Sequence, residues 1–150
     1  MPVWIVALAD NIEVHFGIGE MIEIPFGNGP VTAAINVDDL RCEYLRDPLG
    51  IDTVQPRLSW IVTSDKRGEK QTAYQILVAS SEKMLGEDHG DVWDSGKVVS
   101  DETIQINYEG RPLSSREQCF WKVRAWDRNG QPGDWSRPAR WEMGLLKPED

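Results

Sequence analysis

Hydrophobic and polar residues alternate with a period of two in many short segments of the chain, a pattern typical of β-strands. Residues 119–126 show it most clearly. Cys119, Trp121, Val123 and Ala125 fall on one side of an extended strand there. This side is wholly apolar, so we expect it to face the protein interior. The other side mixes aromatic and cationic residues, and we expect it to lie in solvent or under a partner.

Six further segments show strand-like composition and are separated by Gly, Pro and Asp. These predicted strands are 40–45, 57–64, 73–80, 92–99, 103–108 and 139–145. Helical periodicity is confined to residues 80–88, where Ser80 or Ser81 would cap a short helix and Gly86 would end it. Seven short strands with turns between them predict an all-β fold, an antiparallel two-sheet β-sandwich. The pattern by itself leaves a barrel open.

Residues 1–36 differ from the rest because they carry four acidic residues and no Lys or Arg. The segments IEVHF and MIEIPF alternate and predict short strands, with glycine-rich turns after them. We therefore expect an extra hairpin or a leader at 1–36, a β-sandwich at 37–146 and the start of a linker at 147–150. The charged region of a signal peptide is missing from the first residues, and no transmembrane segment is visible. The compartment stays unassigned.

The seven tryptophans are the main aromatic resource of the chain. Alternation places Trp60 and Trp121 on inward faces, so both are predicted core residues. Trp126 and Trp135 fall among arginines and leave three readings open: a cation–π ladder, an interdomain contact or a carbohydrate platform. The candidate aromatic and arginine surface consists of Phe120, Arg124, Trp126, Trp135 and Arg137.

Net charge and cysteine content exclude several classes of partner. A formal charge of −9 argues against nucleic acid, which needs a basic stripe, and against a polybasic contact with a membrane. Two cysteines are too few for a disulfide scaffold, although one bridge between Cys42 and Cys119 stays open. Cys119 falls on an inward face, which favours an inert thiol. No cofactor is expected.

The densest acidic clusters are residues 38–39 and 87–94. The second lacks the alternating acids, central Gly and terminal Glu of a calcium loop, and we expect Asp94 to bond the backbone near Gly96 instead. The serines lack the Gly-x-Ser-x-Gly pattern, and His15 and His89 are isolated. We predict no catalytic and no metal-binding residue.

Four segments in a fixed order resemble one known family. They are LRCEYLRDPLGIDTVQPRLSW, QTAYQILVASS, VWDSGKV and RPLSSREQCFWKVRAWD. Together they resemble the N-terminal domain of bacterial α-L-rhamnosidases of glycoside hydrolase family 78, from about Val37 onward. Residues 121–144 also resemble the end of a fibronectin type III domain. Cys119 stands where that fold usually has the tyrosine of its tyrosine corner, and residues 1–36 match nothing in the family.

The resemblance implies a non-catalytic accessory domain whose partners are the other domains of a parent glycosidase. In the family, an (α/α) barrel hydrolyses terminal α-L-rhamnose with inversion, which requires two separated carboxylates. That barrel is absent from this chain. Two alternatives stay open: a carbohydrate-binding module that stacks sugars on Phe120, Trp126 or Trp135, and a protein–protein adhesion domain.

Overall fold

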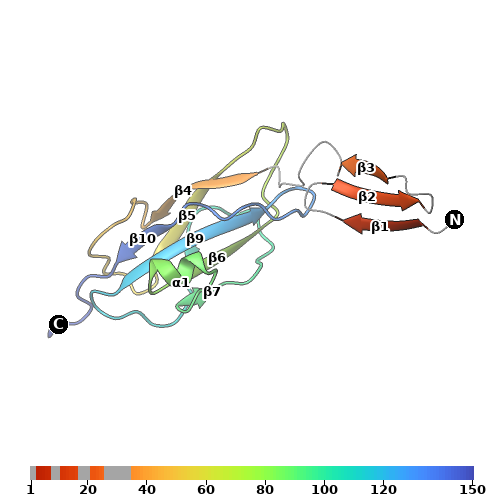
Figure 1. Cartoon of the computed structure of the whole chain (residues 1–150). Helices are drawn as coiled ribbons and strands as arrows, with labels where there is room; N and C mark the ends of the chain where they lie inside the picture. Colours follow the sequence, from red (N-terminus) through yellow and green to blue (C-terminus); the bar gives the residue numbers. More distant parts are fainter. Residues whose placement is uncertain (1–2, 8–10, 17–20, 26–34) are drawn as a thin grey trace. The chain divides into compact units, whose positions relative to one another are not determined.

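The structure is a computed structural model in which the chain divides into two compact units, Met1–Thr32 and Ala33–Asp150 (Figure 1). It describes residues 3–7, 11–16, 21–25 and 35–150, with side chains from residue 35 onward.

The first unit contains a three-stranded antiparallel sheet in the order β1-β2-β3. Its strands are β1 (Val3–Ala7), β2 (Asn11–Phe16) and β3 (Met21–Pro25). Val3 pairs with Phe16, and Asn11 pairs with Pro25. The alternating residues 12–16 and 21–25 therefore lie in strands as predicted, and β1 is an additional strand that the alternation did not predict. The side chain of His15 lies outside the described part of the chain.

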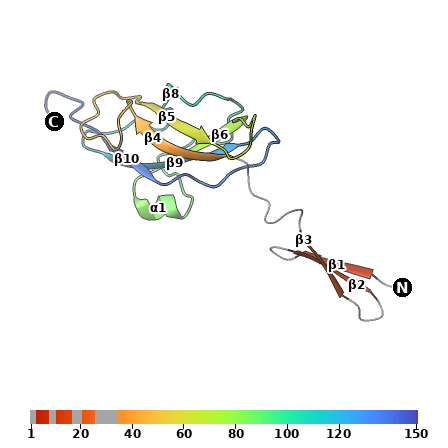
Figure 2. The same cartoon turned by 90° about the horizontal axis from the view of Figure 1, so that it is seen from above.

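The second unit is an antiparallel β-sandwich, which confirms the predicted all-β fold class (Figure 2). Its strands are β4 (Asn36–Cys42), β5 (Arg57–Thr63), β6 (Ala73–Ala79), β7 (Trp93–Asp94), β8 (Ile106–Asn107), β9 (Gln118–Trp126) and β10 (Ala139–Glu142). One sheet has the order β4-β5-β8 and the other has the order β10-β9-β6-β7. Each sheet thus combines strands from distant parts of the chain.

Several strand boundaries differ from the prediction for local reasons. The strands expected at 92–99 and 103–108 shrink to two residues each, because the backbone leaves extended geometry at Gly96 (φ 65°) and Gln105 (φ 56°). β4 begins four residues earlier than expected and contains a bulge next to Asp39, whose φ is 51°. The helix is present as α1 (Glu82–Gly86), and the hydroxyl of Ser81 caps it by accepting the N–H of Met84.

The core lies between the two sheets, and alternation in β9 predicted its composition correctly. Trp121 is fully buried, and Trp60 is 2% exposed. Trp121 packs edge-to-face on Trp141, and Trp141 packs in the same way on Tyr108, with ring centroids 6.1 and 5.9 Å apart. Tyr108 continues this aromatic row to the half-buried Trp93 at 5.3 Å. Both predicted core tryptophans are therefore confirmed.

The expectation that the other face of β9 lies in solvent or under a partner is wrong. Lys122 and Trp126 on that face are each only 7% exposed. Helix α1 packs on this side of the sheet, as Figures 1 and 2 show. A second, smaller hydrophobic cluster forms there from Leu77, Ala79 and Leu85, with Met84, Phe120 and Trp135 packed against it. The chain itself covers this face.

Both cysteines, Cys42 and Cys119, are free and buried. Cys119 occupies a core position at the site where a tyrosine-corner residue was expected. Tyr108 anchors the neighbouring loop instead. The hydroxyl of Tyr108 donates a 2.5 Å hydrogen bond to the carbonyl oxygen of Arg111. Close packing at Gly110 supports this arrangement, since a Cβ there would lie 2.4 Å from the Tyr108 hydroxyl and 2.5 Å from the Cβ of Trp93.

Candidate functional site

A cation–π ladder runs along the outer face of β9. The guanidinium of Arg124 lies over the rings of both Trp126 and Trp135, at 5.0 and 4.7 Å from their centroids. The ammonium of Lys122 lies 4.9 Å from the Trp135 centroid. Lys97 extends the ladder, with its ammonium 5.1 Å from the Trp126 centroid. The structure therefore contains the ladder of Trp and Arg that the sequence suggested, with Arg124 at its centre.

Polar contacts hold two cations of the ladder, Arg124 and Lys122, in place. Arg124 Nε donates to the Gln75 side-chain oxygen at 3.0 Å, and Gln75 Nε2 donates to Asp94 at 2.9 Å. The buried ammonium of Lys122 pairs with the carboxylate of Asp88, just after α1. Because cations already lie over both tryptophan rings, little flat aromatic surface remains for a sugar to stack on.

Four of the five candidate surface residues come together on this face of the sheet. Phe120 and Trp135 are half-buried against the small cluster under α1, and Arg124 and Trp126 join them through the ladder. Arg137 does not join them. It is exposed and lines a separate pocket beside β10. A binding role for these residues stays a prediction.

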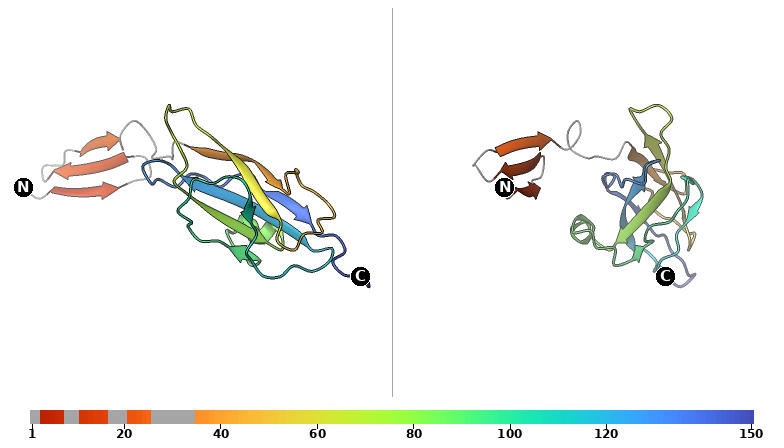
Figure 3. Two further views of the ribbon diagram at one scale, coloured as in Figure 1. Left: turned by 180° about the vertical axis from the view of Figure 1, so that it is seen from behind. Right: turned by 90° about the vertical axis from the view of Figure 1, so that its right-hand side faces the viewer.

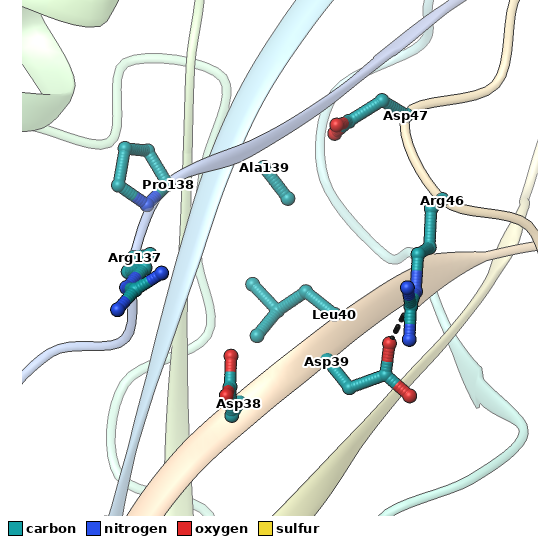
Figure 4. Close-up of a pocket in the computed structure, with 8 residues that line it drawn as sticks. All are labelled: Asp38, Asp39, Leu40, Arg46, Asp47, Arg137, Pro138 and Ala139. Atoms are coloured by element: carbon teal, nitrogen blue, oxygen red, sulfur yellow. Dashed lines mark hydrogen bonds and ion pairs between the residues drawn. The ribbon is translucent and has the colours of Figure 1, made fainter.

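The pocket beside β10 has a volume of about 400 Å³ and is rich in charge (Figure 4). It is lined by Asp38, Asp39, Leu40, Arg46, Asp47, Arg137, Pro138 and Ala139. Asp39 pairs with Arg46 at 2.7 Å and with Arg41 at 3.2 Å, and the hydrogen bond from Arg46 lowers the pKa of Asp39. Asp47 accepts the backbone N–H of Arg140 at 3.0 Å. Asp39, Arg46 and Asp47 therefore bind other groups of the same chain, and Asp47 links the loop after β4 to β10.

A second cavity has a volume of about 310 Å³, and no pattern in the sequence predicted it. It lies beside β7 and β8, and both strands carry residues that line it. β7 is an edge strand of one sheet, and β8 is an edge strand of the other. We call it the edge groove. Its lining residues are Tyr74, Trp93, Ser95, Val98, Glu102, Gln105, Ile106, Asn107 and Glu109. These residues come from three separate segments, β6, 93–98 and 102–109, which is why no local motif pointed to them.

Cys42 and Cys119 are buried in the fold, and Asp94 is hydrogen-bonded within a turn. Burial raises the pKa of Cys119 to about 12 and raises that of Cys42 as well, so both thiols stay protonated. Asp94 accepts the backbone N–H of Gly96 at 2.8 Å, as predicted. Among the described residues, no group of three or more His, Cys, Asp or Glu side chains could hold a metal ion.

The described part of the chain also contains no helix long and apolar enough to cross a membrane. Its single helix, α1, has five residues.

The sheet order and the buried aromatic core define the class of this domain: a small immunoglobulin-like β-sandwich. Residues 37–147 match the family described as the Rha78A-like, N-terminal immunoglobulin domain. The chain belongs to this family, as the motifs in its sequence suggested.

Its relatives are much longer proteins named α-L-rhamnosidases. The chain is 48% identical over 114 residues to one from Streptomyces avermitilis, covering 76% of this chain and 11% of the relative. It is 39% identical over 113 residues to one from Formosa agariphila, covering 75% of this chain and 12% of the relative. The chain thus spans only about a tenth of the length of these relatives.

Solved structures of α-L-rhamnosidases also match this chain over a small part of their own length. The crystal structure of Streptomyces avermitilis α-L-rhamnosidase complexed with L-rhamnose matches with a TM-score of 0.73 and 46% identity, over 77% of this chain and 11% of that one. The α-L-rhamnosidase from Dictyoglumus thermophilum matches with a TM-score of 0.73 and 43% identity, over 75% of this chain and 13% of that one.

Proposed function

We propose that this chain is the non-catalytic accessory domain of an α-L-rhamnosidase, which packs against the catalytic barrel and positions it. The barrel would hydrolyse terminal α-L-rhamnose, and it lies outside this chain. The family match and the names of the relatives support this assignment, since the chain covers only 11% to 12% of the curated relatives cited above. The other domains of the parent enzyme are the partners that follow from it.

An apolar surface at one end of the sandwich carries this proposal. Leu45, Leu49 and Leu145 are 56%, 69% and 53% exposed, and we call them the apolar end. The backbone segments that carry Leu49 and Leu145 pair with each other: the N–H of Ile51 donates to the carbonyl of Glu142 at 2.9 Å, and the N–H of Gly144 donates to the carbonyl of Ile51 at 2.7 Å. Exposed apolar side chains gathered in one place are typical of a protein interface.

The position of the apolar end fits a contact with a following domain. Figures 1 and 3 show the loop between β4 and β5 at the same end of the sandwich as the C-terminal segment. Gly144 lies against Gly50, where a Cβ would meet the Gly50 carbonyl oxygen at 3.1 Å, so the two segments are closely packed. A domain that follows this segment in a longer protein would therefore meet Leu49 and Leu145 first.

The surroundings of the aspartates in the acidic cluster at 87–94 support a non-catalytic role. Asp88 pairs with Lys122, Asp91 accepts hydrogen bonds from the Ser80 backbone and hydroxyl, and Asp94 holds a turn. An inverting glycosidase instead needs two carboxyl groups about 6.5–9.5 Å apart on either side of a bound sugar. These aspartates act as structural links of the fold.

A chimeric enzyme tests the packing role. Residues 37–147 would replace the matching segment of the Streptomyces avermitilis α-L-rhamnosidase. Leu49→Asp and Leu145→Asp would then each be compared with Val99→Asp, a control residue that is 82% exposed. We expect the two variants of the apolar end to lower the melting temperature of the chimera and to speed proteolysis between domains, while the control does neither.

Equal behaviour of all three variants would contradict the packing role. The non-catalytic assignment has its own test, since the isolated chain should not hydrolyse p-nitrophenyl α-L-rhamnoside above the rate of buffer. Turnover at an enzyme-like rate would overturn that assignment and leave the packing result unaffected.

A further inference from the structure

The edge groove carries polar groups that the fold itself does not use. Its exposed side chains Glu102, Gln105, Asn107 and Glu109 make no hydrogen bond or ion pair with another described residue. Glutamates elsewhere on the sandwich differ: Glu43 is paired with Arg57, and Glu117 is paired with Arg111. An internal partner for the groove carboxylates is therefore lacking in the described structure.

Tyr74 gives an independent indication that the groove accepts a ligand. Its side chain is more than nine-tenths buried, yet its hydroxyl has no hydrogen-bond partner among the described residues. Tyr74 lines the groove, and burial together with the charges of Glu102 and Glu109 raises the pKa of its hydroxyl. The hydroxyl oxygen itself is accessible to water, so it is a hydrogen-bond donor that is available to a ligand.

Trp93 supplies apolar surface on the same cavity. It is half-buried, and its position is fixed by the edge-to-face contact with Tyr108 and by close packing over Gly110. Val98 also lines the groove. A few apolar side chains beside several convergent polar groups are typical of a small-molecule site, and a volume of about 310 Å³ falls at the lower end of the usual range of about 300–1,000 Å³.

The loop that carries Glu102 is held rigidly, so the groove is formed before any ligand arrives. The buried side chain of Gln71 donates from Nε2 to the carbonyls of Ser100 and Glu102, at 3.0 and 2.9 Å. The backbone N–H of Trp60 donates to the carbonyl of Thr103 at 2.9 Å. A preformed site loses less conformational entropy when it binds.

The charge of the groove selects the class of ligand. Carboxylates and side-chain amides accept hydrogen bonds from hydroxyl groups, and the tryptophan ring offers a face for C–H groups. Two carboxylates without a cation, on a chain of formal charge −9, repel an anionic ligand. We propose that the edge groove binds a neutral sugar residue through adjacent hydroxyl groups. This inference does not depend on the packing role proposed above.

A titration monitored by ¹⁵N–¹H NMR tests the proposal on the whole 150-residue chain. The probes are L-rhamnose, D-mannose and D-galactose, with D-glucuronate as the anionic control, each up to 50 mM. We expect at least one neutral sugar to shift amides within residues 93–109, and D-glucuronate to bind at least fivefold more weakly. No shift with any neutral sugar, or shifts centred on Trp126 and Trp135, would overturn the proposal.

Two substitutions locate the binding without disturbing the fold. Glu102→Gln and Glu109→Gln remove exposed carboxylates that have no partner in the described structure, and Glu87→Gln changes an exposed carboxylate away from the groove. The first two should weaken sugar binding at least fivefold each, and the third should leave it unchanged. Equal affinity in all three variants would refute the assignment. Binding of arginine methyl ester in the groove without any sugar binding would refute it too, and would identify a site for a basic side chain.

Discussion

The buried side chain of Gln71 offers a sharp test of how the sandwich is held together. Its Oε1 accepts the indole N–H of Trp60 at 2.9 Å, and its Nε2 donates to the carbonyls of Ser100 and Glu102. Gln71 is 4% exposed and connects the core to the loop that forms the edge groove. Gln71→Met introduces an apolar side chain of similar length and removes all three hydrogen bonds.

The expected cost follows from the burial of each partner. The indole N–H of Trp60 is buried, and leaving it without an acceptor costs about 1–3 kcal/mol. The two carbonyls lie in partly buried bonds, where water can replace the amide, so each adds about 0.5–1.5 kcal/mol. These contributions sum to about 2–6 kcal/mol, so the free energy of unfolding should fall by about 4 kcal/mol. For a domain of this size, that change lowers the melting temperature by about 15 °C.

Urea denaturation followed by tryptophan fluorescence, with thermal unfolding by circular dichroism, measures this change. Gln55→Met is the matched control, since Gln55 is exposed and should stay within about 0.5 kcal/mol of the wild type. In a Trp60→Phe background the cost of Gln71→Met should shrink by about 1–2 kcal/mol, because no indole is left unpaired. A Gln71→Met protein as stable as the Gln55→Met control would refute the reasoning.

Three further results are expected. Gly110→Ala should destabilise the domain by about 1–3 kcal/mol in urea denaturation, because the new Cβ would overlap the Tyr108 hydroxyl; unchanged stability would mean that the loop adapts. Cys119 should react with a thiol reagent at pH 8 only after denaturation, since burial raises its pKa to about 12, and rapid labelling of native protein would contradict this. Arg57 lowers the pKa of Glu43, so the salt bridge stabilises the fold above about pH 4.5 and this contribution is lost as pH falls through the lowered pKa. Glu43→Gln should therefore be less stable than the wild type at pH 7 and equal to it near pH 2, and a constant difference would be evidence against the linkage.

The fold class was predictable because strand alternation is a local property. In β9, each inward residue from Cys119 to Ala125 follows from its position in a period of two, and all are buried as expected. The capping of α1 by Ser81 and the turn bond from Asp94 to Gly96 were predictable for the same reason, since donor and acceptor lie within three residues of each other.

The covering of the outer face of β9 could not be derived from the pattern. Trp126 alternates as an outward residue, yet it is buried, because Lys97 and Arg124 pack over its ring. Lys122 is buried for a similar reason, beneath Trp135 and Asp88. An alternation pattern distinguishes the two faces of a strand, but it does not show which face the rest of the chain will cover.

The amino-acid sequence by itself determined the all-β architecture, the inward aromatic residues and the membership of the family. Those features depend on short-range periodicity and on motifs in a fixed order. Only the tertiary structure decided where a ligand could bind. The edge groove unites Tyr74, Trp93, Glu102 and Glu109 from separate segments, and these become neighbours when the edge strands of two sheets meet. Contacts between distant segments depend on how strands are ordered and sheets are stacked, which no local pattern specifies.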